Sequence, residues 1–146
     1  MDYRSLLKNV EKTLSAIEGG DDVVSTVAAV GEAVVGNFRS ELGIVGGRLY
    51  QLDESDYVLK RGFGRFRKVL EGLTVPISYE PIRRALDEGV VLADLKDPWV
   101  DRELETRLGV TRFAAVSFGD GAFLLSFDVH PRVAAVESLF YAKDAQ

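Results

Sequence analysis

The sequence contains no cysteine and only one histidine, His130. Without cysteine the chain has no disulfide scaffold, no thiolate nucleophile, no sulfur ligand for zinc or an iron–sulfur cluster, and no thioether to attach a chromophore. A single histidine also leaves no His-rich metal site and no catalytic pair of imidazoles. Most hydrolase and metalloenzyme templates are therefore excluded, and we expect no catalytic residues and no metal site.

Long apolar runs are also missing, since no segment approaches the roughly 20 residues that span a membrane. The N-terminus lacks the apolar segment of a secretory signal, so we expect a cytoplasmic protein without a membrane partner.

With 146 residues, of which 47% are hydrophobic and 28% charged, the chain is typical of one globular domain. Its net charge of −5 repels phosphate backbones, which argues against nucleic acid as a partner.

Amphipathic helices are predicted near both ends of the chain, where apolar residues recur every three or four positions. Glycine, aspartate and proline supply the expected stop and start signals. The predicted terminal helices cover residues 2–18, 21–40 and 131–144. They carry more apolar surface than one face of a sheet needs, so we expect them to pack together and to form the interface of a homodimer.

Strand and turn signals fill the rest of the chain. The predicted elements are strands 44–50, 57–60, 73–77, 90–93, 113–118 and 122–127, with short helices that begin at Ser78 and at Asp97. Strands 113–118 and 122–127 flank an Asp-Gly turn and are apolar at nearly every position, which predicts neighbouring central strands covered on both faces. Pro76 places its strand at an edge of the sheet or at the strand's own end. We expect one α+β domain over residues 1–146, with helices on both faces of an antiparallel sheet.

This order of elements, together with residues 47–53, 75–78, 90–95 and 113–118, resembles a GAF domain. PAS and other profilin-like modules remain open as alternatives. The resemblance covers almost the whole chain and implies a GAF-like (profilin/PAS-like) six-stranded antiparallel sheet with helices on both faces. It also implies a sensory or regulatory module joined to an output domain such as a histidine kinase, a sigma-54-type activator, a diguanylate cyclase or an HD phosphohydrolase. In that family the terminal helices pack opposite the ligand pocket and commonly form the dimer interface.

Several branches of the family are excluded or weakened by residues that are missing. The cyclic-nucleotide branch carries an Asn-Lys pair, but Asn37 is followed by Phe38 and the pair occurs nowhere. The bilin and methionine sulfoxide reductase branches both depend on cysteine. We therefore expect non-catalytic, noncovalent sensing of a small organic molecule, with no cofactor identified. The alternative is a ligand-free module that dimerises and transmits a signal, which a pocket filled by side chains would favour.

The candidate binding residues are polar side chains that interrupt apolar strands or lie on the helix facing them. They are Arg48, Tyr50, Tyr79, Arg83, Arg112 and Ser117. An arginine inside a sheet covered on both faces needs an anion. If the arginines line the pocket, that anion is a ligand carboxylate or phosphate held by the guanidinium fork. Otherwise it is one of the chain's own Asp or Glu residues.

Three further patterns each have a functional and a structural interpretation. The basic, aromatic run 61–68 could contact phosphates and bases, or form a loop whose phenylalanines pack inward. His130 could be an axial haem ligand or an exposed residue at a helix start. Two clusters of acidic residues could each hold a divalent cation, or serve as helix caps and turns. They are Asp94, Asp97 and Asp101, and Asp53, Glu54 and Asp56.

Overall fold

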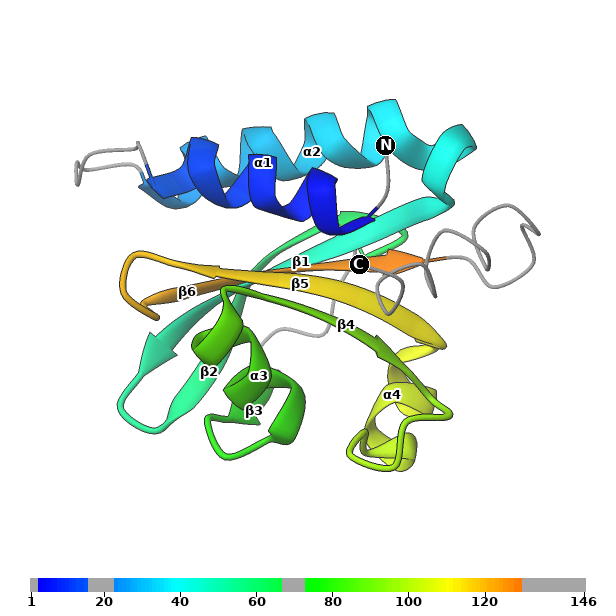
Figure 1. The fold of residues 1–146 in the computed structure, drawn as a ribbon. Helices are drawn as coiled ribbons and strands as arrows, with labels where there is room; N and C mark the ends of the chain where they lie inside the picture. The colour runs from blue at the N-terminus through cyan, green and yellow to red at the C-terminus, as the bar shows by residue number, and fades with distance from the viewer. Residues whose placement is uncertain (1–2, 16–22, 67–72, 130–146) are drawn as a thin grey trace.

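The computed structural model describes residues 3–15, 23–66 and 73–129 (Figure 1). The elements are, in chain order, α1 (Tyr3–Ser15), α2 (Val23–Leu42), β1 (Ile44–Asp53), β2 (Asp56–Gly64), β3 (Thr74–Pro76), α3 (Glu80–Glu88), β4 (Val90–Asp94), α4 (Arg102–Leu108), β5 (Arg112–Phe118) and β6 (Phe123–Val129). The predicted helix 131–144 and His130 lie outside the described residues.

The strands form one antiparallel sheet in the order β3-β2-β1-β6-β5-β4. The predicted six-stranded α+β architecture is therefore confirmed. Strands β5 and β6 are neighbours inside the sheet, joined by a turn in which Gly119, Asp120 and Gly121 all have positive φ. Pro76 lies in the edge strand β3, as a residue without a backbone donor requires.

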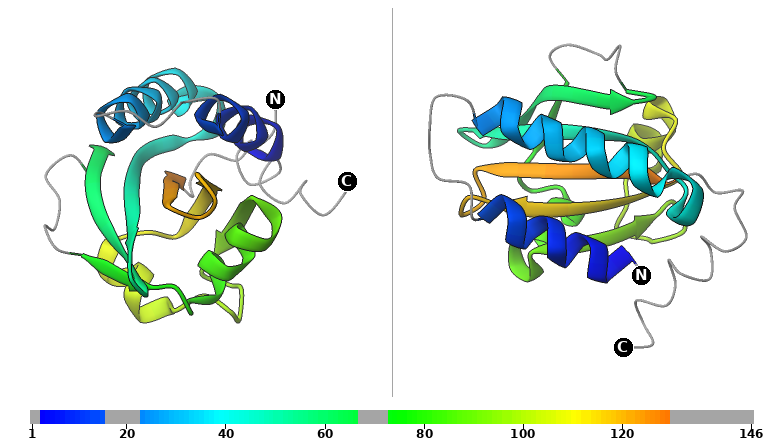
Figure 2. Two further views of the ribbon diagram at one scale, coloured as in Figure 1. Left: turned by 90° about the vertical axis from the view of Figure 1, so that its left-hand side faces the viewer. Right: turned by 90° about the horizontal axis from the view of Figure 1, so that it is seen from above.

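Helices cover both faces of the sheet (Figures 1 and 2). Helices α1 and α2 lie side by side over one face, and α3 and α4 lie on the other. The apolar stripe of α1 is used within the chain, because Leu7 and Leu14 are only 1% and 2% exposed in the core between helices and sheet. None of the described helices is both long and apolar enough to cross a membrane.

Strand β2 continues beyond its predicted end at residue 60, through the glycine-rich segment to Gly64. The reason is the packing of Phe63, which is 1% exposed and enters the core beneath α2. Its ring occupies space that two glycines leave free: an added Cβ would lie 2.7 Å from it at Gly31 and 2.9 Å at Gly47. The charge and glycine content of the segment concealed this strand.

Helix α4 begins later than predicted, at Arg102 rather than near Asp97. Asp101 is the N-cap residue, and its carboxylate accepts a 3.1 Å hydrogen bond from the backbone N–H of Leu104. Asp97 instead accepts a hydrogen bond from the backbone N–H of Asp94, at 2.9 Å. Two aspartates four residues apart both had the chemistry of a cap, and the nearer one caps the helix.

Replacing glycine by alanine should have opposite effects on stability at two positions, Gly64 and Gly36. Gly64 has φ of 58°, and a Cβ there would overlap the carbonyl oxygen of Val45. Gly36 lies in α2 with nothing within 4 Å of an added Cβ. We expect Gly64→Ala to lower the free energy of unfolding by about 1–3 kcal/mol. Gly36→Ala should raise it by about 0.5–1 kcal/mol. Urea denaturation measures both changes, and equal stability of the two variants would contradict this account.

Candidate functional site

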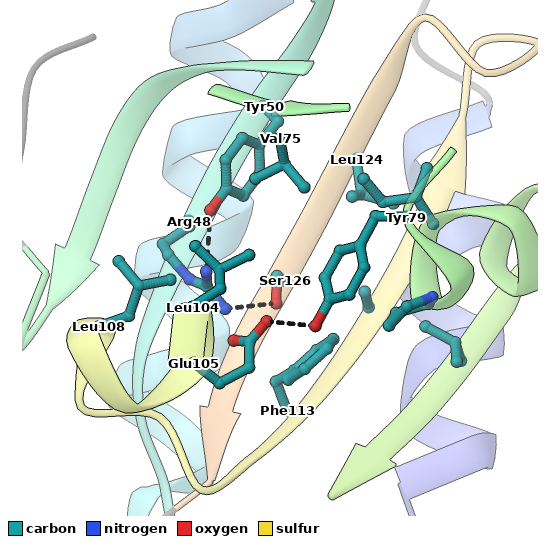
Figure 3. A pocket seen from close by; sticks show the side chains of 14 residues that line it. Arg48, Tyr50, Val75, Tyr79, Leu104, Glu105, Leu108, Phe113, Leu124 and Ser126 are labelled. Carbon is teal, nitrogen blue, oxygen red and sulfur yellow. Dashed lines mark hydrogen bonds between the residues drawn. The ribbon is translucent and has the colours of Figure 1, made fainter. Parts of the chain in front are cut away.

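A small, partly open pocket lies on the face of the sheet opposite α1 and α2, between the sheet, α3 and α4 (Figure 3). It is lined by Arg48, Tyr50, Val75, Tyr79, Pro81, Ile82, Val91, Leu104, Glu105, Leu108, Phe113, Ala115, Leu124 and Ser126. The cavity volume is about 30 Å³. That is room for about two water molecules, whereas pockets for drug-sized ligands measure roughly 300–1,000 Å³.

The floor of the pocket is made by alternate residues of three adjacent strands. Antiparallel pairing of β1 with β6 sets Arg48 opposite Ser126 and Tyr50 opposite Leu124. Pairing of β6 with β5 sets Ser126 opposite Ala115. Because side chains alternate between the faces of a strand, these residues all project to the same side of the sheet. The pocket floor therefore crosses the centre of the sheet, with Arg48 and Ser126 at its middle.

Arg48 is a buried cation, only 4% exposed. Its Nη1 donates to the hydroxyl of Tyr50 at 2.8 Å, and its Nη2 donates to Oγ of Ser126 at 3.1 Å. Its guanidinium carbon lies 5.1 Å from the centre of the Phe66 ring, which suits a cation–π contact. The Nε of Arg48 is buried and has no hydrogen-bond partner within the described part of the chain.

Glu105 is a buried carboxylate on α4, 3% exposed, across the pocket from the sheet (Figure 3). Its Oε2 accepts a 2.8 Å hydrogen bond from the Tyr79 hydroxyl, which itself accepts one from the backbone N–H of Asp101 at 3.0 Å. Its Oε1 is buried and has no partner among the residues described. Burial raises the pKa of Glu105, although the positive charge of Arg48 and the Tyr79 hydrogen bond oppose that effect.

The cation and the carboxylate face the same cavity without pairing directly. No ion pair seen among the described residues joins Arg48 to Glu105. Burial alone would lower the pKa of Arg48, but its interactions with Tyr50, Glu105 and Asp128 outweigh burial and raise that pKa. The arginine therefore stays charged. The arrangement leaves a donor on Arg48 and an acceptor on Glu105 without a hydrogen-bond partner among the described residues.

An arginine that is ion-paired to the sheet also holds the C-terminal end of α4. Asp128 on β6 is 3% exposed and forms an ion pair with Nε of Arg65, which follows β2. The same arginine donates from Nη2 to the carbonyl oxygen of Leu108 at 2.9 Å, at the C-terminal end of α4. Burial raises the pKa of Asp128 to about 6 despite the opposing charge of Arg65. We call this arrangement of Arg65, Asp128 and the end of α4 the α4 clasp.

The structure brings together three of the predicted binding residues, Arg48, Tyr50 and Tyr79. The other three do not line this pocket. Arg83 is exposed on α3, 3.5 Å from a carboxylate oxygen of Glu80. Arg112 is buried and donates to the carboxylate of Asp94 at 2.6 Å, so the anion that it required comes from the chain itself. Ser117 donates to the carbonyl oxygen of Ala85 at 3.0 Å, where α3 covers the sheet.

The sequence analysis missed two polar residues of the pocket, Ser126 and Glu105. Ser126 interrupts an apolar strand in the same way as Ser117, so the signal used for one would have found the other. Glu105 carries no such signal, because a glutamate in a short charged helix is most often exposed. Only the seating of α4 on the sheet turns that side chain inward.

The other candidate patterns take structural roles where they are described. Phe63 and Phe66 of the basic run are 1% and 6% exposed, so they pack inward and are not free to stack on bases. Asp94 accepts hydrogen bonds from the backbone N–H of Lys96 and from Arg112. Over residues 3–15, 23–66 and 73–129, no group of three or more His, Cys, Asp or Glu side chains is placed to hold a metal ion.

No sequence family and no curated protein matches the chain. Among solved structures, it is similar to the A. aeolicus nlh2 GAF domain in an inactive state, at 10% identity and a TM-score of 0.51, over 98% of this chain and 89% of that one. The GAF domain of a two-component sensor histidine kinase from Bacillus halodurans matches at 13% identity and a TM-score of 0.48, over 76% and 85%. A GAF domain region from Geobacter sulfurreducens PCA matches at 14% and 0.49, over 97% and 99%. The first likeness shows that the chain has the GAF fold.

The raised pKa of Asp128 predicts a pH-dependent stability. Between the ordinary value of 3.8 and the folded value of about 6, the folded chain holds a proton that the unfolded chain has lost. Stability contributed by this group is therefore complete below the lower value and is lost as pH rises through the upper one. We expect the free energy of unfolding to fall more steeply from pH 4 to pH 7 in the unmodified protein than in Asp128→Asn.

Urea denaturation at several pH values between these limits measures the two slopes. The matched control is Asp87→Asn, which alters an exposed carboxylate on α3 and should leave the slope unchanged. Parallel curves for the unmodified protein and Asp128→Asn would show that Asp128 does not titrate in this range.

Proposed function

We propose that this GAF-fold domain is a non-catalytic sensory and regulatory module that binds a small polar molecule in the pocket between the sheet, α3 and α4. The observation that carries this proposal is the buried pair of opposite charges, Arg48 and Glu105, which line one cavity and each have an atom without a partner in the described part of the chain. Unpaired buried polar atoms cost about 1–3 kcal/mol each unless water or a ligand satisfies them. Apolar residues in the same space would make the fold at least as stable, so stability alone does not explain the buried charges.

The same geometry supplies a route from ligand to signal. Glu105 lies on α4, and the α4 clasp ties the end of that helix to Asp128 on β6. A ligand that draws Glu105 toward Arg48 would move α4 closer to the sheet and change the contacts of the α4 clasp. In a longer signal-transduction protein, that shift would regulate an output domain, such as a histidine kinase, HD phosphohydrolase, diguanylate cyclase or sigma-54-type activator, in the cytoplasm.

Native mass spectrometry of the purified protein tests ligand binding directly, before and after incubation with a protein-free extract of cellular small molecules. We expect a low-mass adduct on the unmodified protein that is absent under denaturing conditions. The adduct should be lost in Arg48→Met, which removes the buried charge and keeps a long side chain. Arg83→Met, on the exposed face of α3, is the matched control and should keep the adduct. An unmodified protein that carries no adduct even after incubation would contradict the proposal.

A second candidate function is supported by the size of the cavity and by the outer surface of the helices. A pocket with room for about two water molecules also suits a ligand-free module that dimerises and transmits a signal. Helices α1 and α2 share a groove whose described lining residues are all uncharged: Asn9, Val10, Thr13, Val30, Ala33, Val34, Asn37 and Phe38. A second copy of the chain, with the same uncharged groove, is the partner this surface fits.

Light scattering at micromolar concentration tests the dimer. We expect twice the mass of one chain, reduced to a single mass by Ala33→Arg, which places a charge in the groove. Ala33 is exposed, so the change leaves the core intact, whereas Leu14 is buried against the sheet and Leu14→Glu would unfold the chain. Asp87→Arg on α3 is the control and should leave the dimer unchanged. The mass of one chain for the unmodified protein would exclude the dimer at that concentration.

A further inference from the structure

The sheet side of the pocket offers hydrogen-bond donors and a positive charge. A guanidinium carries five N–H donors in a planar fork, and the hydrogen bonds of Arg48 to Tyr50 and Ser126 fix that plane. Its buried Nε remains without a partner among the described residues. The group that completes this site is an acceptor, and a carboxylate matches the fork best because it accepts two parallel hydrogen bonds.

The helix side of the pocket offers an acceptor and a negative charge. Oε1 of Glu105 is buried and unpartnered within the described residues, while Oε2 is held by the Tyr79 hydroxyl. Tyr79 is in turn fixed by the backbone N–H of Asp101. The carboxylate cannot turn toward solvent without breaking its bond to Tyr79, so the group that satisfies Oε1 has to bring a donor into the pocket.

The charge balance of the pocket excludes ligands of a single sign. An anion placed at Arg48 would lie beside Glu105, and a cation placed at Glu105 would lie beside Arg48, both in a poorly hydrated space where like charges repel strongly. The other buried ionic group on this face, Asp128, is already paired with Arg65 and adds no net charge. The site is therefore complementary to a neutral molecule that carries both signs.

The size of the pocket limits that molecule further. A cavity of about 30 Å³ holds about two water molecules, so a carboxylate and an ammonium group joined by one carbon fill it. The remaining walls are apolar and include Val75, Ile82, Leu104 and Phe113. Inside the cavity they leave no space for a side chain larger than hydrogen.

We propose that the pocket is a site for a small zwitterionic amino acid of the size of glycine, with its carboxylate at Arg48 and its ammonium group at Glu105. This inference rests on the proposed function, since it names the ligand class of the same pocket. It also gives the signal a direction, because such a ligand pulls α4 and the sheet together through opposite charges.

An NMR titration of the folded protein tests the charge requirement. The probes are glycine, acetate, methylammonium and leucine, followed through the backbone amides of Ser126 and Glu105. Acetate and methylammonium each carry one of the two charges, and leucine carries both on a molecule too large for the cavity. We expect glycine to bind at least tenfold more tightly than acetate or methylammonium, and leucine to leave the two amides unshifted.

A pair of variants on one helix tests the role of Glu105. Glu105→Gln keeps the shape of the side chain and removes its charge, so it should abolish the tenfold preference for glycine over acetate. Glu103→Gln alters an exposed carboxylate two residues away and should keep the preference. The amide spectrum of each variant shows in the same experiment whether it is folded.

The outcomes separate this inference from the proposed function. Acetate binding as tightly as glycine, or a folded Glu105→Gln that keeps the preference, would overturn the zwitterion and leave a pocket for another polar ligand. Leucine shifting the pocket amides would overturn the size limit in the same way. If none of the four probes shifts the amides and native mass spectrometry finds no adduct, only water occupies the cavity and both proposals fail.

Discussion

The burial of one positive charge in the middle of the sheet governs the arrangement of the pocket face. Arg48 lies on β1, one of the two central strands, where no solvent can neutralise it. The charge of Arg48 is stabilised by contacts with a tyrosine hydroxyl, a serine hydroxyl and aromatic rings, and by carboxylates at a greater distance. A helix that carries one of these carboxylates, Glu105 on α4, completes the enclosure.

The two faces of the sheet have accordingly been given different chemistry. The face under α1 and α2 is a core of mainly aliphatic and aromatic side chains, with Leu7, Phe63 and Phe127 almost fully buried, and its one described ion pair joins Arg112 to Asp94. The face under α3 and α4 mixes apolar walls with buried ionic groups, two of which, Glu105 and Asp128, have raised pKa values because they are buried. The face under α1 and α2 stabilises the fold mainly through apolar packing. The face under α3 and α4 holds a polar site, which lowers the stability that this face contributes.

Local patterns predicted the sheet better than the site. The apolar strands β5 and β6 and the Asp-Gly turn between them required nothing beyond nearest neighbours in sequence, and the same holds for Pro76 at the edge. Arg48 was found because a charge in a buried strand is conspicuous. Its distant counterpart Glu105 was not, and neither was the pairing of Arg112 with Asp94, because which anion meets which arginine depends on strand register and helix placement. Those follow from the assembled fold.

The central position of the β1–β6 pair has a consequence for folding kinetics. Strands β1 to β3 and strands β4 to β6 are each built from neighbouring segments, and in the described sheet the backbone pairing between the two halves is that of β1 with β6. The bond from Arg48 to Ser126 crosses this seam between residues 78 positions apart. Contacts of such range form late and separate early, so the polar site matures only when the halves have docked. A molecule bound between β1 and β6 would therefore chiefly slow unfolding and leave the rate of folding almost unchanged.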